Sequence, residues 1–167
     1  MTSAELLADA FDRIEQVVTR AVSGLTDDQL ATRVGPAANP VAWLVWHLTR
    51  IQDDHVAGVA GTEQAWTAGG WYERFGLPFE PADHGYGHSA EQVAAVRVPA
   101  DLLLGYHAAV HADTDRYVST LVDADLDRVV DTSWDPPVTA GVRLVSVVSD
   151  CLQHAGQAAY VRGLLGS

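Results

Sequence analysis

The pattern of apolar and polar residues predicts four long helices, of which the first is the most regular. Its apolar positions recur at helical spacing: Leu6, Phe11, Ile14, Val17, Val18 and Val22. This spacing places them on one face of an α-helix. Thr2 and Glu5 stand three residues apart, which is the pattern of a capping box at a helix start, and Gly24 ends the periodic stretch.

Three further long helices follow along the chain. Asn39-Pro40 is typical of an N-cap followed by the first helical residue, and the helix that it predicts runs to about Val59. A third helix opens at Pro99 and has its apolar face at Leu103, Tyr106, Val110, Tyr117 and Leu121. The fourth helix runs from about Thr139 to Leu165.

The connections between these helices also carry signals. Two short capping patterns, Thr26–Gln29 and Ser89–Gln92, predict helices of one or two turns. Residues 61–88 form a long connection rich in glycine, proline and aromatic residues. A connection of this length in a compact domain is usually functional or carries short elements of its own, so we expect it to form the mouth of a site. Residues 129–134 predict a short extended segment.

Together these elements predict an all-α fold, a four-helix bundle with a long crossover between its second and third helices. The chain of 167 residues is long enough to bury a full hydrophobic core. No internal repeat or change in composition divides the sequence, so we expect residues 1–167 to form a single domain. Bundles of this kind bind metals through side chains that project inward from facing helices.

The charge of the chain excludes some classes of partner. Acidic residues outnumber basic ones by 22 to 10, all ten basic residues are arginine, and the formal net charge is −12. Such a chain repels phosphate backbones and anionic membrane surfaces, and its arginines form no cluster along the sequence. We therefore expect no binding to nucleic acid and no membrane association.

Cys151 is the only cysteine, so the chain forms no intramolecular disulfide. The sequence opens with a polar helix rather than a secretory signal, and no apolar stretch reaches membrane-spanning length. These features predict a cytoplasmic protein. Cys151 itself is expected to face the core as a small buried hydrophobic residue.

The candidate chemistry lies at polar positions inside apolar helices. Asp150 and His154 are four residues apart, so their side chains share one helix face, and His47 lies in the apolar stretch Trp43–Leu48. A buried polar group without a partner costs about 1–3 kcal/mol. Two histidines and a carboxylate with an open fourth position form a ligand set for a divalent metal. The spacing alone leaves an alternative, in which Asp150 and His154 hydrogen-bond to each other and His47 bonds to a carbonyl group.

Other histidines offer weaker candidates. His107 and His111 form a second pair at i,i+4, on the predicted third helix, and this spacing also occurs in metal sites. We rank this pair second because its face is partly solvated. His55 lies two turns after His47 and is expected to line the cavity without reaching the ion. In His84-Gly-Tyr-Gly-His88 we expect the histidines to have capping or turn roles.

Three segments carry a resemblance to a known family. They are Asn39-Pro-Val-Ala-Trp-Leu-Val-Trp-His47-Leu48, Gly85-Tyr-Gly-His-Ser89 with Val93 following, and Asp150-Cys-Leu-Gln-His-Ala-Gly-Gln157. With these motifs the chain resembles the DinB-like superfamily of four-helix bundles, and within it the branch related to mycothiol-dependent maleylpyruvate isomerase. The resemblance spans nearly the whole chain.

This resemblance implies a divalent metal, commonly zinc or nickel, bound by His47, Asp150 and His154. Many DinB-like members have histidine at the position of Asp150, and the isomerase branch typically has glutamate. The shorter aspartate requires the last helix to approach the ion more closely. The resemblance also implies a low-molecular-weight thiol such as mycothiol, held as thiolate at the open coordination position, which attacks an electrophilic substrate. The implied activity is thiol transfer or thiol-assisted isomerisation.

Four further residues are candidates for the pocket of the thiol or the second substrate: Arg50, Gln157, Trp71 and Arg74. The first two each lie one turn after a proposed ligand, so both can border the same cavity. The Arg50 guanidinium could bind a substrate carboxylate or form a surface salt bridge with Asp53 or Asp54. The other two lie in the long connection, where they would either cover the pocket or pack the connection onto the bundle.

Two other functions fit the same residues. One is a non-catalytic, metal-stabilised dimer that serves as a binding or stress-associated protein. The other is a metal-dependent hydrolase in which the ion activates water. The apolar surface of the first and third helices suggests a homodimer. The sequence assigns no catalytic residue beyond the proposed ligands.

Overall fold

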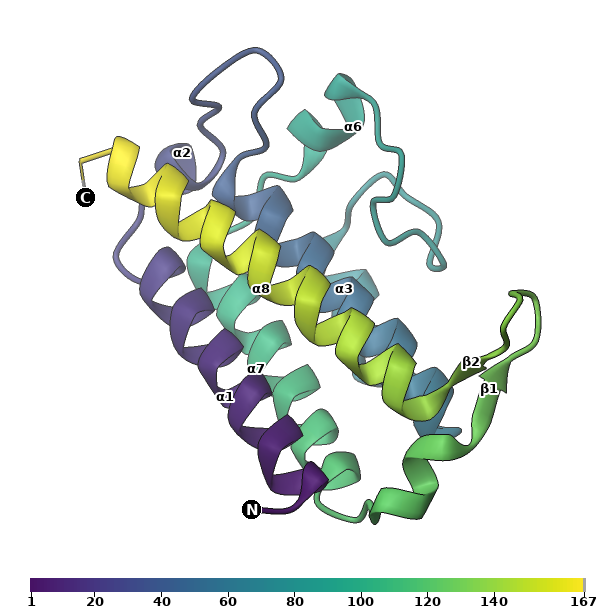
Figure 1. The fold of residues 1–167 in the computed structure, drawn as a ribbon. Helices are drawn as coiled ribbons and strands as arrows, with labels where there is room; N and C mark the ends of the chain where they lie inside the picture. The colour runs from purple at the N-terminus through teal and green to yellow at the C-terminus, as the bar shows by residue number, and fades with distance from the viewer. Residues whose placement is uncertain (167) are drawn as a thin grey trace.

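The computed structural model describes residues 1–166, which form an all-α bundle of four long helices (Figure 1). These helices are α1 (Ser3–Val22), α3 (Val41–Ala60), α7 (Ala100–Val118) and α8 (Ala140–Leu164). The predicted fold class is confirmed, and so is the long crossover, which connects α3 to α7.

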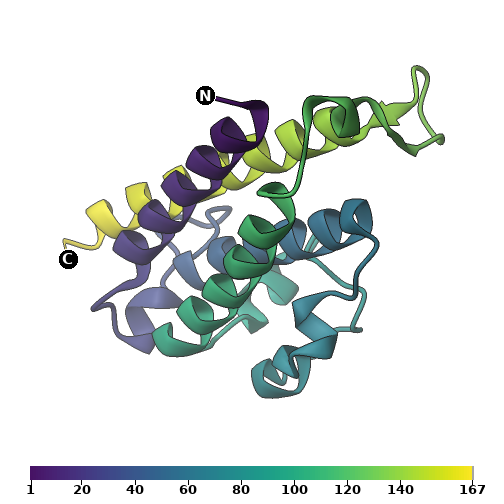
Figure 2. The ribbon, with the colours of Figure 1, turned by 90° about the horizontal axis from the view of Figure 1, so that it is seen from below.

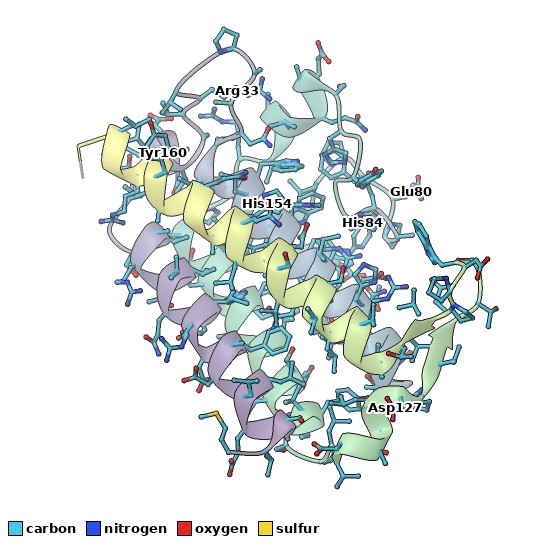
Figure 3. The ribbon with its side chains drawn as sticks, in the orientation of Figure 1. Arg33, Glu80, His84, Asp127, His154 and Tyr160 are labelled. Carbon is cyan, nitrogen blue, oxygen red and sulfur yellow. The ribbon has the colours of Figure 1, made fainter. Side chains whose placement is uncertain are left out.

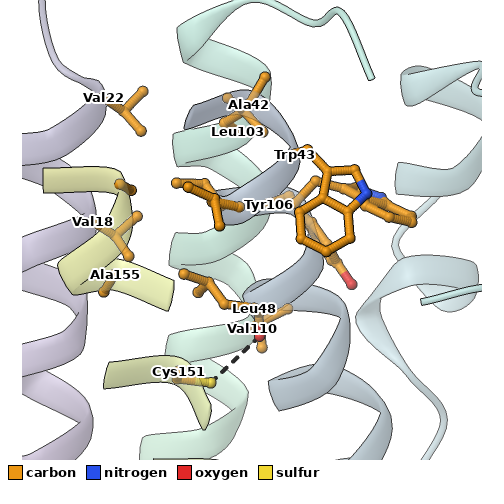
Figure 4. Packing of buried hydrophobic residues seen from close by; sticks show 14 of the residues in the cluster. Val18, Val22, Ala42, Trp43, Leu48, Leu103, Tyr106, Val110, Cys151 and Ala155 are labelled. Carbon is orange, nitrogen blue, oxygen red and sulfur yellow. Dashed lines mark hydrogen bonds between the residues drawn. The ribbon is translucent and has the colours of Figure 1, made fainter. Parts of the chain in front are cut away.

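The four helices pack in the cyclic order α1, α8, α3 and α7, so that α7 and α8 each contact both α1 and α3. Apolar side chains from all four helices are fully buried at the centre, among them Ile14, Leu44, Leu103 and Leu144. Cys151 belongs to this core, as predicted, and its thiol donates a 3.5 Å hydrogen bond to the Leu48 carbonyl (Figure 4). This contact ties α8 directly to the backbone of α3.

Most helices begin where their caps predict. The Thr2 and Glu5 capping box is present at the start of α1, and α8 begins after the N-cap residue Thr139. The predicted start of α3 is wrong by one residue. Its N-cap is Pro40, whose ψ of 160° is extended, and the helix begins at Val41 without a side-chain cap. The extended backbone of Pro40 leaves no role for Asn39 as N-cap.

The shorter elements lie in the connections. Four of them are short helices: α2 (Asp27–Leu30), α4 (Ala65–Ala68), α5 (Trp71–Phe75) and α6 (Ala90–Ala95). The capping boxes predicted for α2 and α6 are both present. The connection after α3 therefore carries helical turns of its own, which fold it back against the bundle.

A small antiparallel hairpin precedes α8. The 3₁₀ helix η1 (Asp123–Asp127) leads into β1 (Val129–Asp131), which pairs with β2 (Val138–Thr139). The predicted extended segment at 129–134 thus covers β1, and the pairing with β2 was not predicted. The hairpin projects from the N-terminal end of α8 (Figure 2).

Within residues 1–166, every helix is too short or too polar to cross a membrane.

Candidate metal centre

The structure brings together the three side chains that the sequence singled out. His47 on α3 faces Asp150 and His154 on α8, and one potential ligand atom from each lies within 4.8 Å of the others. The two imidazole rings are 4.9 Å apart between centroids and nearly perpendicular, at 77°. Among the described residues, this is the one cluster of three or more such groups.

The tautomer of His47 is fixed by a backbone carbonyl. Its Nδ1–H donates a hydrogen bond to the carbonyl oxygen of His84, which can only accept. The Nε2 lone pair is therefore left for a metal ion. The imidazole is almost completely buried and stacks on Trp43 at 4.6 Å between ring centroids. Burial lowers the pKa of His47, which favours the neutral form that metals bind.

His154 is oriented in a corresponding way by a side chain of its own helix. Its Nδ1–H donates to the Oε1 atom of Gln157 at 2.8 Å, which leaves its Nε2 lone pair unused. That Nε2 lies 3.7 Å from Asp150 Oδ1, too far for a hydrogen bond. The alternative of a hydrogen-bonded pair between Asp150 and His154 is therefore not what the structure contains.

The carboxylate of Asp150 has an unsatisfied oxygen. Its Oδ2 atom is buried and accepts no hydrogen bond. An unpartnered buried carboxylate oxygen is costly, and a cation is the partner that would remove the cost. Each imidazole is oriented by a hydrogen bond from its Nδ1–H and has its Nε2 left over, and the Asp150 Oδ2 atom has no hydrogen bond. Two imidazole nitrogens and one carboxylate oxygen are a donor set suited to zinc or nickel with a position left open. The residues present thus fit a divalent metal ion.

A loop of the crossover supports this cluster from one side. The carboxylate of Asp83 accepts the Gly85 N–H at 2.8 Å and the His88 Nε2–H at 3.0 Å. The other ring nitrogen of His88, Nδ1, accepts a 3.1 Å hydrogen bond from the Trp43 indole. Partial burial raises the pKa of Asp83, but these hydrogen bonds outweigh it and hold the pKa below its ordinary value. The loop is thus fastened where its His84 carbonyl meets His47. Figure 3 labels His84 of this loop and His154 of α8.

Comparison with known proteins shows the family of the chain. The sequence profile of the mycothiol-S-transferase family matches residues 6–166.

The chain belongs to the mycothiol-S-transferase family.

A solved structure with the same fold is described as the conserved protein of a locus from Enterococcus faecalis. It is 32% identical to this chain, with a TM-score of 0.92, and the alignment covers 100% of this chain and 99% of that one. Among curated proteins, no sequence matches this chain. The predicted resemblance to the mycothiol-dependent DinB-like proteins is confirmed by the family match.

In this member of the mycothiol-S-transferase family, Gly85 is required by a close approach. Its φ of +95° suits glycine, and a Cβ atom placed there would lie 2.9 Å from Trp46 and 3.0 Å from His47 Nδ1. Backbone at this point must come close to the histidine, because the preceding carbonyl accepts its hydrogen bond. A side chain would push the loop away from His47.

We expect Gly85→Ala to lower both the stability of the fold and its affinity for metal. Strain at positive φ costs about 1–2 kcal/mol, and overpacking adds roughly 1–3 kcal/mol. Loss of the carbonyl partner of His47 should weaken metal binding about 10- to 100-fold. Urea unfolding and metal titration measure the two effects.

Gly87→Ala is the matched control. Gly87 also has a positive φ, +76°, but a Cβ atom there would meet nothing within 4 Å. It should therefore show the backbone strain alone and keep the metal affinity of the wild type. Equal metal affinities in the two variants would show that the approach of Gly85 to His47 does not matter for binding.

Arg50 does not have the role predicted for it. Its side chain is 0% exposed, so it cannot reach a substrate carboxylate, and its ion pair with Asp53, at 3.8 Å, is buried rather than on the surface. Nη1 also donates to Gln64 Oε1 at 2.8 Å and to the Tyr106 hydroxyl at 3.3 Å. A buried guanidinium is retained only when such partners satisfy it.

The Arg50 guanidinium also donates hydrogen bonds to the crossover loop. Nε–H donates to the Asp83 carbonyl at 3.2 Å and Nη2 donates to the Pro81 carbonyl at 3.3 Å. Arg50 therefore links α3 to the segment that presents the His84 carbonyl. We interpret it as a positioning residue that acts on the metal centre through the loop.

The predicted pocket roles of Trp71 and Arg74 are also replaced by packing roles. Trp71 is buried on α5 and contacts Tyr106 of α7 at 5.7 Å between ring centroids. Arg74 stacks over the Trp71 ring at 3.9 Å. These contacts attach α5 to α7, which is the second of the two possibilities left open for these residues. Gln157 is the pocket candidate that does contact a proposed ligand.

His55 lies two turns after His47 on α3. Its imidazole is half-buried, 3.5 Å from Asp54, and lines a hollow of ≈ 380 Å³ together with Asp131 and Arg143. Burial lowers the pKa of His55. His55 is not among the clustered ligand atoms, and the residues that line this hollow include none of the three proposed ligands. Its expected place in the cavity of the ion therefore stays a prediction.

The rival pair does not form a three-residue cluster. His107 is buried, and its Nδ1 pairs with Thr49 Oγ1 on α3 at 3.1 Å. His111 points toward α1, where its Nε2 lies 3.1 Å from Asp12. The two rings of the pair therefore contact different helices, His107 with α3 and His111 with α1, and they point toward different partners.

Burial of His107 makes a pH-dependent contribution to stability. Burial lowers its pKa to about 3, whereas a histidine in the unfolded chain titrates near 6.5. Between these two pH values His107 is protonated in the unfolded chain and neutral in the folded chain. Acidification therefore lowers the free energy of unfolding. We expect a loss of about 2–3 kcal/mol between pH 7 and pH 4.5. Urea unfolding across this range should show that part of the pH dependence missing in His107→Gln. An identical pH dependence in both proteins would contradict the assignment.

Proposed function

We propose that this protein is a metal-dependent S-transferase that uses a low-molecular-weight thiol of the mycothiol type. In this proposal His47, Asp150 and His154 hold one divalent ion, with zinc or nickel the best suited. The observation that carries it is the convergence of these three groups, with both histidine tautomers fixed and one carboxylate oxygen buried without a partner.

A divalent ion, when bound, supplies a Lewis acid at which a thiol loses its proton at neutral pH. The chain supplies the rest. The His84 carbonyl and the Gln157 amide fix the orientation of the two imidazole rings. Trp43 covers His47 on one face and limits access of water there. Asp150 contributes the negative charge that partly neutralises a divalent cation.

The family match supports a thiol as the first substrate and a transfer reaction rather than an isomerisation. The thiol sulfur would form a bond to an electrophilic carbon of a second small molecule while the bond from that carbon to a leaving group breaks. The leaving group would depart with the electron pair of that bond, and the thiol proton would pass to solvent. Cys151 is not this nucleophile, because it is buried in the core and burial raises its pKa well above the ordinary value. We further propose a cytoplasmic location, where such thiols are kept reduced.

The proposal is tested by the rate of thiol conjugation. Metal-loaded wild type, mixed with mycothiol and a small electrophile, should consume thiol faster than the uncatalysed reaction, and metal-free protein should not. His154→Ala should behave as the metal-free wild type does, because it lacks a proposed ligand. A metal-loaded wild type that never exceeds the uncatalysed rate, with any of several electrophiles, would contradict the proposal.

The same preparations separate the alternatives. Cleavage of esters or amides without thiol would favour the hydrolase. Bound metal that raises thermal stability but supports no reaction would favour the non-catalytic binding or stress-associated protein.

A further inference from the structure

The outward face of α8 differs in composition from the rest of the surface. Twelve residues of α8 are exposed and none of them is charged, although the chain has 22 acidic and 10 basic residues. Several are large and apolar, between 43% and 68% exposed: Val142, Val145, Leu152, Tyr160 and Leu164. Exposed positions of α7, by contrast, include Asp101, Asp113, Asp115 and Arg116. Nothing within residues 1–166 covers this face of α8 (Figure 1).

The exposed positions of α8 have the spacing of a helix-packing seam. Seven of them alternate at three and four residues: Val142, Val145, Ser149, Leu152, Gly156, Ala159 and Gly163. This is the spacing along which two helices pack in a coiled coil. The buried positions of α8 are different residues that pack in the bundle. The helix therefore has two packing faces, of which the bundle uses one.

Two glycines on this seam are not required by the fold of the chain. Gly156 lies in the interior of α8, where glycine costs about 1 kcal/mol relative to alanine, and Gly163 lies in the last turn of the helix. A Cβ atom at either position would meet nothing within 4 Å. The distance between packed helices falls when the residues at the contact are small. A helix that approaches α8 from outside the chain would explain why these positions are small.

We propose that a second copy of this chain covers the face, with α8 packed antiparallel on α8 about a two-fold axis near Leu152. Leu152 is the middle residue of α8, which runs from Ala140 to Leu164. An antiparallel pair centred there places Val145 opposite Ala159, and Val142 opposite Arg162, one residue before Gly163. The larger side chains at one end of the seam then lie against the smaller ones at the other end, as a self-complementary two-fold interface requires.

The length of the seam favours a second copy as the occupant, and its lack of charge lets two acidic copies meet there. Two copies with a formal net charge of −12 each repel one another, so they can associate only where the contact excludes charge. The seam from Val142 to Gly163 spans about 32 Å, long enough for a contact on the order of 800 Å² per partner. The homodimer expected from the sequence is therefore reassigned from the first and third helices to α8.

Sedimentation velocity tests the association. Wild type should sediment as a dimer, twice the 17.9 kDa of one chain, across the micromolar range. Leu152→Glu, which puts a charge on the axis, and Gly156→Gln, which fills the close approach, should both shift the protein to the monomer. Leu6→Glu is the control, because Leu6 is a 58% exposed residue of α1 and receives the same change on another face.

The control variant should remain dimeric, and circular dichroism should show that all three variants keep their helices. A wild type that is monomeric throughout, or a dimer that both seam variants leave intact, would overturn the proposal. Neither result depends on metal, so the outcome is separate from that of the proposed reaction.

Cross-linking tests the antiparallel arrangement. Under mild oxidation, Leu152→Cys should form a disulfide-linked dimer, because the two copies of this position meet at the axis. Val142→Cys should not, because its two copies lie at opposite ends of the pair. The native Cys151 is 0% exposed and does not compete. Cross-linking through Val142→Cys but not through Leu152→Cys would contradict the antiparallel pairing.

Discussion

Replacing His47 or His154 by alanine is expected to abolish stoichiometric binding of zinc or nickel. Each residue supplies one of three clustered ligand atoms, and two ligands do not hold a labile divalent ion against water and buffer. The loss of metal affinity should be greater than the roughly 10- to 100-fold weakening that follows when a residue hydrogen-bonded to a metal ligand is removed. Competition with a chromophoric chelator measures the affinity directly.

His111→Ala is the matched control for these variants. It removes an imidazole of the rival i,i+4 pair, where His111 lies 3.1 Å from Asp12. Its metal affinity should equal that of the wild type. If His111→Ala lost the metal while His154→Ala kept it, the site would belong to α7 rather than to the junction of α3 and α8.

Replacing Arg50 by methionine is expected to cost about 3–5 kcal/mol of unfolding free energy, because removing one partner of a buried ion pair leaves the other charge uncompensated. The carboxylate of Asp53 would lose its buried cation, and the carbonyls of Pro81 and Asp83 would lose their donor. A loss of this size is a large share of the roughly 5–15 kcal/mol that stabilises a typical domain. Urea unfolding of the metal-free proteins measures it.

Arg74→Met makes the same change at an exposed arginine. The Arg74 guanidinium stacks on Trp71, but its removal leaves no buried charge uncompensated. The cost should therefore stay near 1 kcal/mol, about the value of an exposed cation–π contact. If Arg50→Met unfolded like the wild type and only weakened binding of a substrate carboxylate, the substrate role first predicted for Arg50 would be restored.

The helices and the three clustered groups could be predicted because both depend on local periodicity. Side chains at i and i+4 of one helix share a face whatever the rest of the fold does, so Asp150 and His154 had to lie together. His47 could be joined to them only through the apolar setting of its helix and the family resemblance. The structure then supplied the antiparallel packing of α3 on α8 that brings the three groups within reach.

The misassigned residues depend on contacts distant in sequence. Arg50 lies one turn from His47, as a pocket residue would, but its burial is decided by Gln64, Tyr106 and the loop at 81–83. No local pattern reveals such a set of partners. For Trp71 and Arg74 two roles stayed open, over the pocket or packed on the bundle, because the 61–88 connection has no periodicity from which its path could be predicted.

The support of His47 was missed for a related reason. The partner of its Nδ1 is a backbone carbonyl, which every residue has, so the residue type at position 84 gives no signal. Asp83 and His88 hold that carbonyl in place through the Gly85 N–H and the Trp43 indole. The available signal was a run of histidines and glycines in a long connection, which predicted only turn or capping roles.

His47, Asp150 and His154 should hold one divalent ion with a coordination position open to a thiol. Cobalt(II) reports both features, because its visible absorption depends on the number of ligands and a coordinated sulfur adds a charge-transfer band. We expect cobalt-loaded wild type to gain this band when mycothiol is added, and His154→Ala to bind no cobalt. A wild type that binds no cobalt, or a cobalt spectrum that no thiol alters, would contradict the assignment of this cluster as a thiol-binding metal centre.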